Sequence, residues 1–167
     1  MPAVFLATTN SGLDWQVDQL IRSDIKENDI VIWGGSFPIS FSWFIDSKLY
    51  NIWPYWNEFI DDEQFHSKKE LLSTMLEDES RIKLSIRHMA QVISFCKKLK
   101  VKLVIAYYPI DREVQEFKDF VKTTPYYLEL PKVVDLAADR SHPGPITHAL
   151  YAKRIQEYIE NNLKVKS

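Results

Sequence analysis

Short apolar segments that alternate with stretches of helical periodicity constrain this sequence more than any other feature. The apolar segments cover residues 3–7, 29–33 and 101–107, and a shorter one covers 126–130. Between them, apolar side chains recur at intervals of three and four, most clearly over 81–99. Strands that are apolar throughout and joined by helices are typical of a parallel sheet covered on both faces. The sequence therefore predicts an α/β fold with a central, mostly parallel sheet.

The helical segments show which side chains face the core. The clearest helix is expected over 81–99, and further helices are expected from residue 13, over 112–122, and from about Thr147 onward. The stripe on the clearest helix consists of Ile82, Ile86, Met89, Ile93 and Cys96. For the aromatic-rich segment 37–56, which two prolines interrupt, we expect an irregular excursion with short helical turns. A helix around 70–76 is the expectation for the polar segment that follows.

Length and charge limit the classes of protein that fit. The 167 residues fit a single domain, 1–167, and a chain of about 150 residues buries roughly 70% of its unfolded surface. A core can therefore form without metals or disulfides. Because 21 Lys+Arg face 23 Asp+Glu, the formal charge is −2 and provides no long-range field for phosphates or anionic lipid. We expect neither nucleic acid nor membrane as a partner.

The cysteine content and the short motifs bear on the expected cellular location and on the expected cofactors. Cys96 is the only cysteine, which excludes a disulfide framework and favours a reducing compartment. We read this thiol as buried and inert. The N-terminus lacks the basic region of a signal peptide, and no window approaches 18 apolar residues, so a cytoplasmic location is expected. No metal-ligand spacing, GxGxxG or phosphate loop occurs, so we expect no metal and no cofactor.

The segment with the strongest chemical signal contains Asp139 and His142. These two residues are three positions apart, in a loop stiffened by Pro143 and Pro145. A carboxylate beside an imidazole holds its tautomer and stabilises its charged form, and the imidazole then serves as general base for a hydroxyl. The alternative is that Asp139 is a turn or capping residue and His142 an exposed loop histidine.

The same segment resembles a known family. From Asp139 to Ile155 it reads DRSHPGPITHALYAKRI, which resembles the last conserved block of the SGNH (GDSL-like) hydrolases. In that block Asp-x-x-His, often followed by Pro, completes a Ser-His-Asp triad just before the C-terminal helix. The resemblance implies that Asp139 orients, that His142 acts as base and that His148 is structural. It also implies a flavodoxin-like three-layer α/β/α sandwich and metal-free hydrolysis of esters or acyl groups.

The N-terminal part matches the family in two ways, and both lack its Gly-Asp-Ser nucleophile motif. One alignment sets TTNSG on the first block and makes Ser11 the nucleophile. The other sets this region on the second block, where Gly12 matches the oxyanion glycine. DIVIWGGSF then resembles the third block, with Gly34 matching its glycine and Ser36 replacing its Asn. Under the second alignment the nucleophile strand is missing or is supplied by another chain.

The two serines also have ordinary interpretations. Ser11 follows one strand and precedes a helix, where backbone N–H groups stabilise an oxyanion, but Ser is also a favoured helix cap. Ser36 follows two glycines, where backbone can approach a ligand closely, but it also fits an ordinary turn.

Two function hypotheses therefore stand. In the first, the chain is an SGNH-like hydrolase of small-molecule or glycan esters, with Asp139, His142 and Ser11 catalytic and with Gly12, Gly34 and Ser36 at the oxyanion or substrate. In the second, it is a catalytically inactive SGNH-like domain that binds a protein partner through the aromatic stretch Phe37–Trp56, as a structural subunit of a virion or other large assembly. A flavodoxin-like domain with an unrelated ligand is a third, weaker option.

Overall fold

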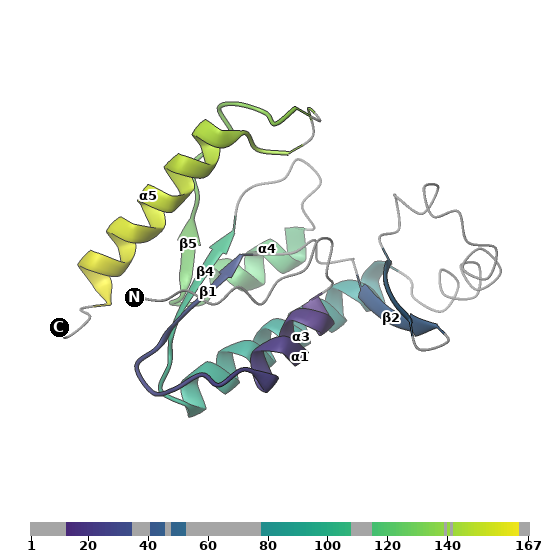
Figure 1. The fold of residues 1–167 in the computed structure, drawn as a ribbon. Helices are drawn as coiled ribbons and strands as arrows, with labels where there is room; N and C mark the ends of the chain where they lie inside the picture. Colours follow the sequence, from purple (N-terminus) through teal and green to yellow (C-terminus); the bar gives the residue numbers. More distant parts are fainter. Residues whose placement is uncertain are drawn as a thin grey trace.

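The computed structural model describes residues 13–34, 41–45, 48–52, 78–107, 115–138, 140 and 142–163 (Figure 1). Helices and strands follow one another along these residues. They are α1 (Leu13–Arg22), β1 (Ile30–Gly34), β2 (Phe41–Ile45), β3 (Lys48–Ile52), α3 (Asp78–Lys98), β4 (Lys102–Tyr107), α4 (Gln115–Lys122), β5 (Tyr127–Glu129) and α5 (Pro145–Asn162).

Three of the strands form a parallel sheet in the order β1-β4-β5. In its register, Trp33 lies beside Ile105, and Ile105 lies beside Tyr127. All three strands therefore end at the same edge, called here the carboxyl edge. The predicted α/β class and its parallel sheet are confirmed, while the strand expected over 3–7 lies outside the described residues.

Alternate side chains of β4 enter two separate cores. Leu103, Ile105 and Tyr107 pack in one core with residues of α1, α3 and α4. Val104 and Ala106 pack in the other, which α5 supplies with Tyr151 and partly buried side chains. Figure 1 accordingly shows α5 on one side of the sheet and α1 and α3 on the other. The inward face predicted for α3 is confirmed by the first of these cores.

The aromatic segment after β1 forms a hairpin. β2 and β3 pair antiparallel, with Phe41 opposite Ile52 and Trp43 opposite Tyr50, and β2 lies against α1. The expected irregular excursion with short helical turns is therefore wrong for this part of 37–56. Aromatic and β-branched residues favour strands, but only pairing between two segments turns that tendency into a hairpin. The helix expected around 70–76 lies outside the described residues.

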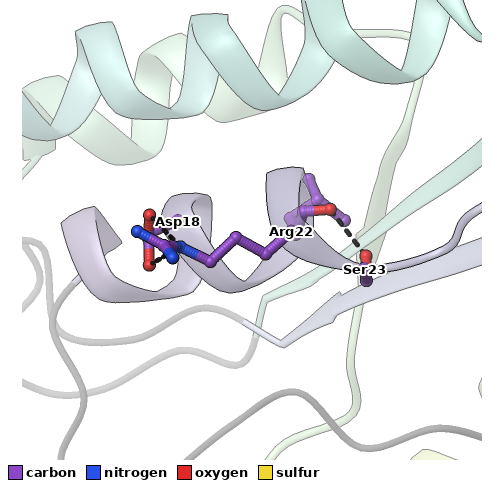
Figure 2. Close-up of polar contacts among 4 residues, drawn as sticks. Asp18, Arg22 and Ser23 are labelled. Carbon is purple, nitrogen blue, oxygen red and sulfur yellow. Dashed lines mark hydrogen bonds and ion pairs between the residues drawn. The ribbon is translucent and has the colours of Figure 1, made fainter.

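Helix α1 ends at Arg22, where Figure 2 shows two polar contacts. Arg22 Nε donates to Asp18 Oδ1 at 2.8 Å, one turn earlier, and the Ser23 hydroxyl donates to the carbonyl of Leu20 at 2.6 Å. The second bond gives a partner to one of the carbonyl groups that the last turn of a helix leaves without an intrahelical donor. The ion pair is exposed on both sides and contributes little to stability. Burial of the apolar face holds α1 in place, and that face consists of Leu13, Val17 and Leu20.

The predicted stripe on α3 is buried as expected. Met89 and Cys96 are buried, and Ile82, Ile86 and Ile93 pack against the same core. Burial raises the pKa of the Cys96 thiol to about 11, so little reactive thiolate exists near neutral pH. The sole cysteine therefore acts as a small apolar core residue.

Helix α3 ends in a Schellman motif. The N–H of Val101 donates to the carbonyl of Cys96 at 2.8 Å, and the N–H of Lys100 donates to that of Lys97 at 3.2 Å. Lys100 has φ 56°, in the left-handed region that this position requires. A side chain there costs about 1–2 kcal/mol, because Cβ approaches the next carbonyl oxygen.

Replacement of Lys100 by glycine is expected to stabilise the protein. Lys100→Gly removes the left-handed penalty, and the extra freedom of glycine in the unfolded chain offsets part of the gain. The net expectation is about 0.5–1 kcal/mol, or a melting temperature higher by about 1–4 °C. The exposed pair between Lys100 and Glu27 is lost at little cost.

The matched control is Gln91→Gly, an exposed position inside α3, where glycine costs about 0.5–1 kcal/mol. Thermal unfolding followed by circular dichroism compares the two variants. A lower melting temperature for both would contradict the role assigned to Lys100.

Candidate functional site

The segment 131–144 connects the carboxyl end of β5 to the start of α5. Leu130 continues the sheet as its N–H donates to the carbonyl of Tyr107 at 3.4 Å. At the opposite edge, Lys102 Nζ donates to the carbonyl of Leu163 at 2.7 Å and ties the start of β4 to the end of α5. The N-terminus of α5, and with it the segment 131–144, therefore lies toward the carboxyl edge. This is the edge at which open parallel sheets bind ligands.

The carboxylate of Asp135 caps the N-terminus of α5. Its Oδ1 accepts hydrogen bonds from the N–H of Thr147 at 2.7 Å and from the Thr147 hydroxyl at 2.5 Å. Its Oδ2 accepts from the N–H of Ile146 at 3.0 Å. The first N–H groups of a helix have no partner inside the helix, and Gly144 at the N-cap has no side chain to offer. Asp135, Ile146 and Thr147 are together called the Asp135 cap.

The hydroxyl of Thr147 bonds both the carboxylate of Asp135 and the backbone N–H groups of residues 134 and 135. Its side chain is fully buried, and its hydroxyl oxygen accepts from the N–H of Val134 at 3.1 Å and from that of Asp135 at 3.2 Å. The same hydroxyl donates to the carboxylate. One buried oxygen therefore fixes both the backbone before Asp135 and the carboxylate itself.

A short antiparallel contact closes the loop around His142. Leu136 and Pro143 form an isolated bridge, the N–H of Ala137 donates to the carbonyl of His142 at 2.9 Å, and the N–H of Gly144 donates to that of Asp135 at 2.9 Å. The main chain of His142 is thus fixed by hydrogen bonding, while its side chain is exposed.

Gly144 is required for steric reasons. Its φ of −84° and ψ of 179° are extended values that any residue adopts. However, a Cβ at this position would lie 2.6 Å from Cγ of Asp135 and 2.8 Å from the carbonyl oxygen of Leu136. Only glycine allows the Asp135 cap and the Leu136–Pro143 bridge to lie so close together.

The loop reverses direction through a tight turn. The N–H of Arg140 donates to the carbonyl of Ala137 at 2.9 Å, and Arg140 has φ 56°. Non-glycine residues rarely adopt such a φ, and they keep it where the surrounding structure fixes them. Arg140 is exposed, so its charge lies at the tip of the loop that carries His142.

The contacts of Asp135 favour its charged form. The hydrogen bond from the Thr147 hydroxyl lowers the pKa of this carboxyl below its ordinary value. Partial burial opposes this shift, while the N–H groups of Thr147 and Ile146 and the nearby His148 add to it. A negative charge at a helix N-terminus is also favourable toward the helix dipole.

The ring of His148 stacks edge-on against Tyr151, with centroids 6.1 Å apart. The backbone N–H of His148 donates to the carbonyl of Gly144 at 3.0 Å, within the first turn of α5. The structure thus gives His148 local contacts inside α5. The helix itself begins at Pro145, two residues before the expected start at Thr147, because proline at the first helical position has no N–H that needs a partner.

Two of the site residues predicted from the sequence are described by the structure, His142 and Gly34. Gly34 is the last residue of β1, exposed at the carboxyl edge, and a Cβ there would meet nothing within 4 Å. Since β4 separates β1 from β5, about 10 Å lie between the strands that lead to the two residues. The other four predicted residues lie outside the described part of the chain: Ser11, Gly12, Ser36 and Asp139.

The sequence alone assigned no role in the site to Asp135, Gly144 or Thr147. The signal that identifies them is the pair Gly144-Pro145 at the start of a helix. Such a start provides neither a capping side chain nor a first N–H, so an acceptor from elsewhere has to satisfy the next two N–H groups. An aspartate nine residues earlier in the same segment is the natural candidate.

Among the described residues, no group of three His, Cys, Asp or Glu side chains is arranged to hold a metal ion. None of the described helices is both long and apolar enough to cross a membrane.

Comparisons with known proteins identify no relative of this chain. No family model matches the chain, and neither the curated proteins nor the solved structures contain a match.

Removal of the Thr147 hydroxyl is expected to destabilise the protein. Thr147→Val conserves shape but leaves two N–H groups and one carboxylate oxygen without this partner. The expected loss is about 1–3 kcal/mol of unfolding free energy, measured by urea denaturation. Thr123→Val is the control, because the exposed Thr123 hydroxyl bonds only the carbonyl of Phe120 at the end of α4. Equal losses in both variants would contradict the importance of the Asp135 cap.

Acid is expected to weaken the Asp135 cap. Because the folded-state pKa of Asp135 lies below its unfolded value, the stabilisation is complete above about pH 4. It is lost as the pH falls through the folded-state pKa. Asp135→Asn is therefore less stable than the wild type at pH 6, and the difference narrows toward pH 2.5. Urea unfolding over this range, with Glu129→Gln as the exposed control, tests the expectation; a constant or widening difference would count against it.

Proposed function

We propose that this protein is a serine hydrolase of the SGNH type, built on a flavodoxin-like α/β/α sandwich, that cleaves ester or acyl substrates. The observation that carries the proposal is the anchored loop at the carboxyl edge. The Asp135 cap fixes its backbone, and the side chain of His142 is exposed beyond it. The resemblance of the segment from Asp139 to Ile155 to the last conserved block of this family supports the same assignment.

In the proposed reaction, His142 is the general base. It takes the proton from the hydroxyl of Ser11 as that oxygen attacks the ester carbonyl, and Asp139 orients the imidazole and stabilises its charged form. Backbone N–H groups near Gly12 and Gly34 stabilise the oxyanion, with Ser36 beside the substrate. The imidazolium then gives the proton to the departing alcohol. Water, activated by the same imidazole, hydrolyses the acyl-enzyme and releases the acid.

A second candidate function is a catalytically inactive domain of the same type that serves binding or assembly. The observation that favours it is the absence of a Gly-Asp-Ser motif from the sequence. In this case the segment Phe37–Trp56, which includes the β2–β3 hairpin, is the partner surface. Light scattering that detects only a monomer, together with the lack of a tight partner, argues against it.

Turnover and active-serine labelling test the hydrolase proposal. The wild type is expected to hydrolyse short p-nitrophenyl esters and to react with a fluorophosphonate probe at Ser11. Ser11→Ala is expected to abolish labelling, and His142→Ala is expected to lower kcat/KM by about 10⁴-fold or more.

His148→Ala is the matched control, since it removes another exposed imidazole from the first turn of α5. It is expected to retain turnover close to that of the wild type. A wild-type protein that neither turns over these esters nor reacts with the probe would rule out the hydrolase and leave the binding domain.

A further inference from the structure

We draw no further inference here: the strongest candidate, the surface patch of exposed apolar side chains beside the start of α5 (Val134, Leu136 and Ile146), carries none, because nothing in the described part of the chain shows what covers it.

Discussion

Strand β4 is buried on both of its faces, and the arrangement of the other elements follows from that constraint. Its side chains alternate between a core shared with α1, α3 and α4 and a core shared with α5. Such a strand needs a neighbouring strand on each edge and helices above and below the sheet. Parallel neighbours in turn require crossover connections, which bring every strand to an end at the same edge. The loop with His142 begins at that edge because β5 ends there.

The Asp135 cap decides what this loop does after it leaves the sheet. Helix α5 begins at Pro145, and Gly144 at its N-cap provides no capping side chain. The carboxylate of Asp135 satisfies the helix start, and the same contacts align 134–136 with the first turn of α5. One requirement of helix physics thus orders the backbone of His142 and leaves apolar side chains on the surface beside it. The proposed reaction site depends on this arrangement.

Much of the fold was predictable from local patterns. The apolar runs identified β1, β4 and β5, and the periodicity of Met89 and Cys96 identified the buried face of α3. The hairpin of β2 and β3 was missed, because dense aromatics fit several backbone states and only pairing between two segments selects one. Of the candidate site, the motif containing His142 and its place after the last strand were predictable. The bonds from Thr147 to Asp135 were not, since they join residues twelve positions apart.

The sequence by itself determined which segments are apolar enough to be strands, which helix faces turn inward, and where an acid and an imidazole lie close together in the chain. These properties depend on the order of neighbouring residues and on the periods of helix and strand. Only the tertiary structure decided that Asp135 caps α5, that Gly144 has no room for a side chain, and that residues 134–136 lie beside the first turn of α5. The pair Gly144-Pro145 signals that an acceptor has to come from elsewhere. Which residue provides it, and how closely it lies, depend on contacts between backbone segments that approach each other only after β5 and α5 have packed.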